Sequence, residues 1–263
     1  MANHFEHVEL CMGTAFRFAG NSPLNPDETR AVLSQAVAKL HEADQIFSLY
    51  KPESPLSQLA RGETSVAKCP PVVDEVWNLC EKWEKTTDGW FSPFTPAHTF
   101  DPSGLVKTWA AQASIDVLLG AGLTDFTLNA GGDVFIGPAV TDPIEKKLGI
   151  HKPVSIAAQD AGVLTVIDLA GIDFNSLATS GSAERGAHIW NPRNPDREPS
   201  DLLQVSVVAD DLVKADVWAT AAFAAGMQGV ALLNAVPNLE ALFVLASGDL
   251  AATDGFIKLF ANA

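Results

Sequence analysis

Asp216 and Thr220 are the two side chains whose types and spacing suit chemistry most directly. They lie four residues apart in the segment 215–221, so on an α-helix their oxygens share one face. A carboxylate beside a hydroxyl suits Mg²⁺, which prefers hard oxygen ligands and keeps some of its waters. A solvated aspartate followed by a threonine that bonds its own helix would give the same pattern.

Three other segments combine small residues with polar side chains. Asp101 precedes a predicted helix and could cap its first amide groups, and Gly104 allows a backbone or a ligand to approach closely. Segment 129–133, Asn-Ala-Gly-Gly-Asp, fits a tight hairpin turn or a loop whose amide groups face a phosphate. Segment 178–185 fits a polar loop or an anion site. The Walker lysine and the Rossmann spacing are both missing from these segments.

The composition favours a folded domain and disfavours a nucleic-acid partner. The chain has 263 residues, of which 47% are hydrophobic, and this is enough to bury a sizeable core. The formal net charge is −15, and the basic cluster that a phosphate-tracking protein needs is missing. An acidic chain needs a metal ion, helix N-termini or backbone amides to hold an anionic cofactor. A divalent cation is therefore expected with any phosphate ligand.

The cysteines and the hydropathy pattern predict a cytoplasmic protein. Cys11, Cys69 and Cys80 have an irregular spacing that makes a poor disulfide framework and favours a reducing compartment. Residues 1–9 carry no apolar signal-peptide core, and the sequence shows no apolar run of about 18 residues. We therefore expect no membrane span and a cytoplasmic target.

The hydrophobic periodicity predicts an α+β or mixed α/β fold with substantial antiparallel pairing. The alternation over residues 7–19 predicts one strand, with a possible bend at Gly13. The residues expected on one side of this strand are Val8, Leu10, Met12, Phe16 and Phe18. Asn25 with Glu28 forms a capping box before a helix. The expected helices span 26–47, 71–87, 104–119 and 213–226. The expected loops are 48–67 and 90–102, and 126–137 is a hairpin. The other expected strands are 148–150, 163–169, 177–180, 188–190, 203–209, 242–245 and 255–260.

Six segments together, in order along the chain, resemble the ApbE family of FAD:protein FMN transferases. They are 12–14; 46–50 with 54–57; 101–107; 129–137; 178–181 with 184–185 and 188–189; and 216–220. The resemblance implies a single ApbE-like, T-fold-related domain over 1–263, with largely antiparallel sheets flanked by helices. It implies a Mg²⁺-dependent transfer of FMN from FAD to a Ser or Thr hydroxyl of an acceptor flavoprotein, with release of AMP.

The resemblance also implies roles for individual residues. The metal ligands would be Asp216, Thr220 and Gly104, the last through its backbone carbonyl. The catalytic residues would be Asp216 and Lys107, although a metal-bound carboxylate is a poor base for the attacking hydroxyl. The positions implied to contact FAD are Met12, Tyr50, Trp90, Phe91, Ser92, Asp101, Lys107, Ser180, Gly181, His188 and Ile189, with Trp190 as the alternative to Ile189.

Some positions depart from the family pattern, and two other functions fit the same residues. Ser92 and Asn191 stand where aspartate is usual, Thr108 stands where glycine is usual, Ala183 stands where an aromatic residue is common, and Ala219 stands where some members have a second aspartate. A Mg²⁺-dependent FAD pyrophosphatase, which would release FMN and AMP, is the first alternative. The second is a non-catalytic FAD-binding protein.

Overall fold

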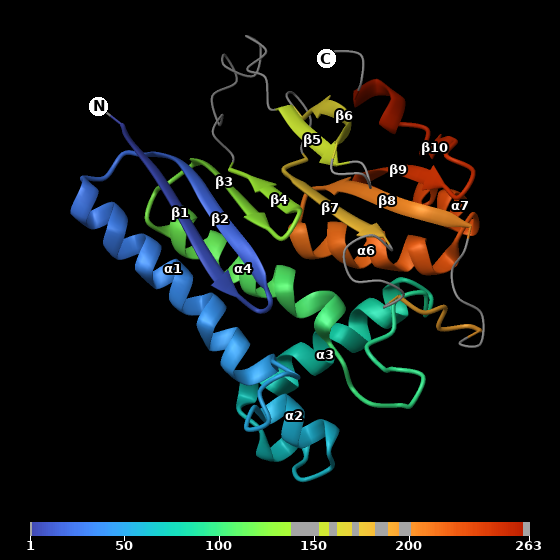
Figure 1. The fold of residues 1–263 in the computed structure, drawn as a ribbon, viewed down its shortest axis with the longest axis horizontal. Helices are drawn as coiled ribbons and strands as arrows, with labels where there is room; N and C mark the ends of the chain where they lie inside the picture. Colours follow the sequence, from blue (N-terminus) through green and yellow to red (C-terminus); the bar gives the residue numbers. More distant parts are fainter. Residues whose placement is uncertain are drawn as a thin grey trace. The chain divides into compact units, whose positions relative to one another are not determined.

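The computed structural model describes residues 2–137, 153–157, 162–169, 174–181, 189–194 and 201–259. The chain divides into two compact units, Met1–Gly132 and Asp133–Ala263. Figure 1 shows helices and antiparallel strands in both. The expected α+β class with antiparallel sheets is therefore confirmed, whereas the expectation of one domain over 1–263 stays a prediction.

The strands of the first unit begin with a hairpin that sequence reasoning missed. β1 (Asn3–Cys11) pairs antiparallel with β2 (Thr14–Ser22), and β2 pairs with β3 (Asp125–Ala130). The chain reverses at Met12 and Gly13, whose φ angles are 52° and 73°. Positive φ at both central residues is typical of a type I′ turn. The prediction of one strand over 7–19 was wrong. Asparagine or aspartate usually precedes the glycine of such a turn, and methionine at position 12 gives no such signal.

The hairpin also changes which side chains face the core. Phe16 and Phe18 are fully buried, whereas Val8 is 52% and Leu10 is 76% exposed. The predicted common side was therefore wrong, because the reversal at Met12 starts a new strand with its own alternation.

The helices of the first unit largely follow their sequence signals. α1 (Pro26–Phe47) begins with the expected capping box, in which Asn25 accepts two amide hydrogen bonds and Glu28 accepts one from the Asn25 backbone. α3 (Pro71–Thr86) and α4 (Ser103–Gly120) also match the prediction. The loop expected over 48–67 was wrong in part, because it contains α2 (Pro55–Ala60) and the 3₁₀ turn η1 (Val66–Lys68).

The second unit is built on an antiparallel sheet with helices and a hairpin. Its strand order is β4 (Asp133–Ile136), β7 (Ser176–Gly181), β8 (Leu202–Ala209), β9 (Leu239–Leu245) and β10 (Leu250–Ala252). β5 (Pro153–Ala157) pairs with β6 (Val163–Asp168) in a separate hairpin. Its helices among the described residues are α6 (Leu212–Ala225), α7 (Gln228–Asn234) and the 3₁₀ helix η2 (Phe256–Leu259).

Several predictions for this unit need correction. The strand expected at 255–260 is the 3₁₀ helix η2, and residues 189–190 are not in a strand. β5, β10 and α7 were not predicted, because elements this short offer too few residues for a clear periodicity. The strand expected at 148–150 lies outside the described residues.

The sheet of the second unit is covered on two sides. Leu177 of β7 belongs to a buried cluster with Ile156 of β5 and Ile167 of β6. Ser180, three residues further along β7, bonds to Thr220 of α6. Because an odd number of positions separates Leu177 from Ser180, they point to opposite faces. The hairpin β5–β6 therefore covers one face and α6 the other.

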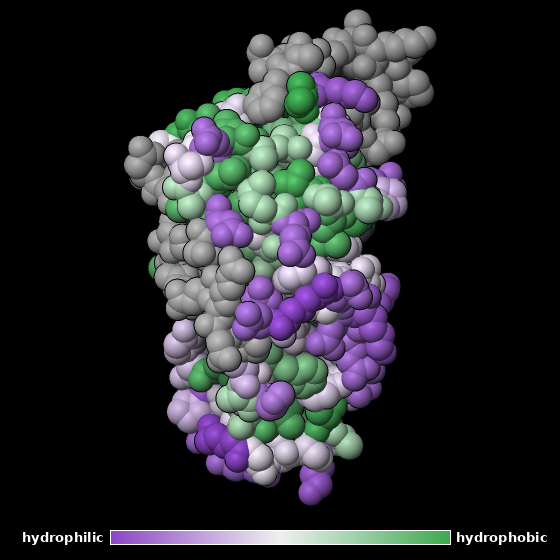
Figure 2. All heavy atoms as spheres, turned by 90° about the vertical axis from the view of Figure 1, so that its right-hand side faces the viewer, coloured by the Kyte–Doolittle hydropathy of each residue, from purple (hydrophilic) through white to green (hydrophobic). Residues whose placement is uncertain are grey.

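In the part of the chain that the structure describes, none of the helices is long and apolar enough to cross a membrane. On the face that Figure 2 presents, hydrophilic and hydrophobic residues are interspersed.

Candidate functional site

α6 and β7 carry three oxygen-bearing side chains of the second unit. Asp211 caps α6 by accepting the Lys214 amide hydrogen, and the helix then places Asp216 and Thr220 one turn apart on one face. The Thr220 hydroxyl lies 3.2 Å from the Ser180 hydroxyl of β7. We call Asp216, Thr220 and Ser180 the oxygen group.

The oxygen group lies at the edge of a buried layer. Asp216 is 6% and Ser180 is 7% exposed, and Thr220 is partly buried. α6 is otherwise hydrophobic on nearly all sides, which is typical of a helix packed inside a domain. Asp216 is thus a carboxylate on a mostly apolar helix, on the same face as the Thr220 hydroxyl.

The donor types of the oxygen group fit Mg²⁺. The group offers one carboxylate and two hydroxyls, which are hard oxygen donors, and it leaves coordination positions for water and phosphate oxygens. Among the described residues, no cluster of three or more His, Cys, Asp or Glu side chains could hold a metal ion. A nitrogen- and sulfur-rich zinc centre is therefore not seen in this part of the chain.

In the first unit, ring contacts and backbone hydrogen bonds fix the loop 90–102. Trp77 of α3 lies 4.4 Å from Phe100 and 5.3 Å from Phe94 between ring centroids. The Asp101 amide donates to the Pro93 carbonyl at 2.8 Å. These contacts give the loop a defined shape directly before α4.

The predicted FAD contacts in this loop are largely buried. Trp90 is 7% and Phe91 is 2% exposed, and the Phe91 amide donates to the Thr87 hydroxyl at 3.0 Å. The Ser92 hydroxyl donates to Glu84 at 3.1 Å and accepts the Phe94 amide hydrogen at 3.2 Å. Core packing alone accounts for the burial of the two rings, so their predicted role as flavin contacts stays a prediction.

Asp101, Gly104 and Lys107 stand at the N-terminus of α4. The Asp101 carboxylate accepts the Ser103 amide hydrogen at 3.0 Å, as a capping residue does. Gly104 lies beside Phe91, where an added Cβ would be 3.4 Å from the ring. Gly104 and Lys107 are three residues apart within α4, so they share one face of its first turns. The amide groups of such a helix start favour anions.

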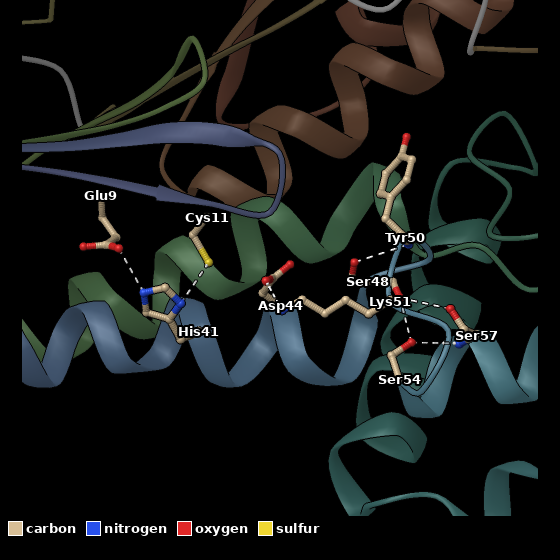
Figure 3. Close-up of polar contacts among 9 residues, drawn as sticks. All are labelled: Glu9, Cys11, His41, Asp44, Ser48, Tyr50, Lys51, Ser54 and Ser57. Carbon is tan, nitrogen blue, oxygen red and sulfur yellow. Dashed lines mark hydrogen bonds and ion pairs between the residues drawn. The ribbon is translucent and has the colours of Figure 1, made fainter.

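Met12 and Tyr50 occupy two separate turns of the first unit. Met12 is the first residue of the β1–β2 turn, and Tyr50 follows α1 with its ring 96% exposed. Figure 3 shows the Tyr50 ring pointing away from the polar side chains around its backbone. A side chain this exposed is available to a ligand.

The glycines of segment 129–133 form a turn and do not present free amides. The Gly132 amide donates to the Asn129 side chain at 2.9 Å, and the Gly131 amide donates to the Ala15 carbonyl at 3.1 Å. The Asp133 carboxylate, 1% exposed, accepts the Thr179 amide hydrogen and joins β4 to β7. The phosphate-binding alternative for these glycines is therefore not supported.

The remaining predicted contacts are Gly181, His188 and Ile189, with Trp190 as the alternative to Ile189. Gly181 is the last residue of β7 and is partly buried. Ile189 and Trp190 are partly buried outside any strand. His188 lies outside the described residues.

A thiol, imidazole and carboxylate series was missed by sequence reasoning (Figure 3). The Cys11 sulfur lies 3.6 Å from His41 Nδ1, and His41 Nε2 lies 3.0 Å from the Glu9 carboxylate. Burial, aided by the nearby Asp44 carboxylate, raises the pKa of Cys11 to about 11. The thiol therefore stays protonated at neutral pH and is no activated nucleophile. The alternation of Glu9 and Cys11 was visible, but their pairing with a helix residue was not.

Comparison with known proteins decides the family. A model of the ApbE family matches residues 94–243, more than half of the chain. The chain belongs to the ApbE family. A protein of Klebsiella pneumoniae (strain 342) named FAD:protein FMN transferase is 28% identical over 165 residues, 59% of this chain. The match spans 48% of that relative, about half its length.

Solved structures confirm the ApbE fold. The ApbE protein of Thermotoga maritima has a TM-score of 0.79 at 18% identity, covering 98% of this chain and 99% of that one. The flavin transferase ApbE of Vibrio cholerae has a TM-score of 0.76 at 16% identity, covering 99% and 100%. At these identities the likeness establishes the fold.

Most positions at which this ApbE chain departs from the family pattern have defined places in the structure. Ala219 is fully buried in α6, so α6 supplies one carboxylate, that of Asp216. Ser92 serves the loop 90–102 through its bonds to Glu84 and Phe94. Thr108 is buried and donates to the Leu105 carbonyl within α4. Asn191 accepts the amide hydrogens of Arg193 and Asn194 in a turn, and Ala183 lies outside the described residues.

Proposed function

We propose that the chain is a Mg²⁺-dependent FAD:protein FMN transferase. The observation that carries the proposal is the oxygen group, in which the Ser180 and Thr220 hydroxyls meet on the face of α6 that also bears Asp216. Membership of the ApbE family and the named relative support FAD as the substrate.

The proposed reaction moves FMN from the bridging oxygen of FAD to the hydroxyl oxygen of an acceptor protein. A Ser or Thr hydroxyl of an acceptor protein forms a bond to the FMN-side phosphorus of FAD and releases its proton to the solvent. The bond from that phosphorus to the bridging oxygen breaks, and AMP leaves with the bridging oxygen. When bound, Mg²⁺ would offset the charge that develops on the phosphoryl oxygens.

Residues of the chain take the roles of holding and orienting the substrate. Asp216 and Thr220 are the proposed metal ligands, and the Ser180 hydroxyl orients Thr220 through their contact. Lys107 and the amide groups at the start of α4 are proposed to hold anionic groups, and the role of Asp101 as an FAD contact stays a prediction. The other roles implied by the family resemblance stay predictions; they concern Met12, Tyr50, Trp90, Phe91, Ser92, Gly104, Gly181, His188 and Ile189.

The test removes the carboxylate of the oxygen group. Asp216→Asn should lower Mg²⁺-dependent AMP release from FAD by about a hundredfold or more, as removal of one charge-stabilising group does in other enzymes. AMP is measured by chromatography with an acceptor protein present. Asp254→Asn is the matched control, because Asp254 is an exposed aspartate of the same unit, and it should keep wild-type activity. Equal AMP release by both variants would reject the metal assignment.

A further inference from the structure

The turn after α1 combines an exposed apolar tip with a buried polar base (Figure 3). Leu49 is 40% and Tyr50 is 96% exposed, whereas Ser54 is 3% and Ser57 is 5% exposed. Burial of apolar surface therefore does not hold Tyr50 in place. Polar contacts below the turn restrain it instead.

Three serines close the base of this turn. The Ser48 carbonyl, at the C-terminal cap of α1, accepts the Ser54 hydroxyl at 2.6 Å and the Ser57 hydroxyl at 3.1 Å. The Ser48 hydroxyl accepts the Tyr50 amide hydrogen at 3.3 Å. A helix leaves its last carbonyls without partners inside the helix, so these hydroxyls also satisfy α1. We call Ser48, Ser54 and Ser57 the serine anchor.

Neighbouring bonds fix the sides of the turn. Ser54 caps α2 by accepting the Ser57 amide hydrogen at 3.0 Å, and its own amide donates to the Lys51 carbonyl at 3.0 Å. The Lys51 ammonium pairs with Asp44 on α1. The residue directly after Tyr50 is therefore tied to α1 through its side chain.

A fixed turn with an exposed tyrosine is suited to ligand binding. Tyrosine offers a large contact area with few rotatable bonds, so little conformational entropy is lost when it is covered. A turn that is ordered before binding lowers that cost further. Its flat ring favours another flat ring as the ligand surface.

We propose that Ser57, acting with Ser54 through the Ser48 carbonyl, is a positioning residue that holds Tyr50 in place for contact with FAD. This inference rests on the proposed function. The hydroxyl of Ser57 touches no substrate in this proposal, and its effect passes through the backbone that carries Tyr50.

The experiment is a double-mutant cycle on FAD affinity. The dissociation constant for FAD is measured from flavin fluorescence with Mg²⁺ present. Ser57→Ala should raise it about fivefold, the factor that one lost hydrogen bond gives, and Tyr50→Ala should raise it further. In the Tyr50→Ala background, Ser57→Ala should have no additional effect, because coupled residues are not additive.

Matched variants separate positioning from general damage. Gln58→Ala in α2 removes a bond to the Glu53 carbonyl and should leave FAD affinity unchanged. Ser57→Thr keeps the hydroxyl and should restore affinity. If Ser57→Ala does not fold, Asp44→Asn, which weakens the Lys51 contact, enters the same cycle with an expected effect of about twofold.

A spectroscopic signal reports on Tyr50 itself. Because the sequence contains a single tyrosine, incorporation of 3-fluorotyrosine gives one fluorine resonance. FAD should shift this resonance in the wild-type protein, and Ser57→Ala should reduce the shift at equal FAD concentration. An unshifted resonance in the FAD-bound protein would overturn the inference.

The affinity outcomes separate the inference from the proposed function. Equal effects of Ser57→Ala with and without Tyr50 would overturn the positioning role. Unchanged affinity in Tyr50→Ala would do the same while leaving the transferase proposal intact. A wild-type protein that binds no FAD would overturn both.

Discussion

The carboxylate of Asp216 is the side chain on which the proposed metal site depends most. It is the one charged side chain among the buried residues of α6, and its oxygens are hard donors of the kind that Mg²⁺ prefers. Asp216→Asn keeps the shape of the side chain and removes its charge, so this variant tests the metal assignment directly.

The cysteine thiols are predicted to differ sharply in reactivity. Burial raises the pKa of Cys80 to about 12, with added repulsion from Glu84 and Asp101, and that of Cys11 to about 11. Cys69 is only partly buried. At pH 8 a thiol reagent should modify one cysteine quickly in the folded protein and all three after unfolding. Cys69→Ser should abolish the fast phase, and two or more fast thiols in the wild-type protein would contradict the structure.

The contacts of Glu9 should make the stability of the fold fall as the pH is lowered. Burial alone would raise its pKa, but hydrogen bonds with His41 and His7 lower the pKa below the ordinary value of 4.5. A lowered carboxylate pKa stabilises the fold above the unfolded value and loses that contribution as the pH falls through the folded value.

The matching measurement is urea unfolding of wild type and Glu9→Gln. Wild type should be the more stable at pH 5.5, by no more than about 1 kcal/mol because the pair is partly exposed. The difference should shrink at pH 3.5. A difference that grows as the pH falls would contradict the assigned contacts.

At the scale of elements, the contact between α6 and α7 depends on one glycine. A Cβ added at Gly229 would lie 2.6 Å from the Ala222 carbonyl oxygen, so α7 would have to shift away from the helix that carries Asp216. Gly229→Ala should lower the free energy of unfolding by about 1–3 kcal/mol, the usual range for overpacking. Chemical denaturation measures this loss.

Gly120→Ala is the control for that substitution. Gly120 is also a helical glycine, but no atom lies within 4 Å of its added Cβ, and alanine favours helices. Gly120→Ala should be neutral or slightly stabilising. Equal destabilisation by both variants would show that helix contact at Gly229 is not the cause.

Elements with strong local signals were predictable from sequence. The asparagine, proline and glutamate at the start of α1 determine its cap through bonds within four residues. The β1–β2 turn was not predictable, because Met12 adopts a positive φ that the tertiary structure imposes. The 3₁₀ helix η2 was missed because a short apolar run fits a strand equally well.

The candidate site shows the same division. Helical spacing was enough to place Asp216 beside Thr220, since both lie on one element. The contact of Thr220 with Ser180 depends on how β7 packs against α6, and the series Cys11, His41 and Glu9 depends on how β1 packs against α1. These contacts join residues that are 30 or more positions apart in the sequence, so no local sequence pattern indicates them.

At the scale of the whole molecule, charge constrains the chemistry. The chain carries a formal net charge of −15, and a field of this sign opposes the approach of a pyrophosphate. A divalent cation at the oxygen group would supply local positive charge against this field. The proposed transferase activity should therefore depend on metal.

The most direct measurement incubates the purified protein with FAD, Mg²⁺ and an acceptor domain bearing an exposed threonine, and separates the products by chromatography. The account predicts AMP together with an equal amount of flavin bound covalently to the acceptor, and the loss of both when a chelator is added. AMP with free FMN, in the same amount with or without the acceptor, would contradict the transferase and indicate a pyrophosphatase. Intact FAD after incubation with the acceptor would contradict the account altogether.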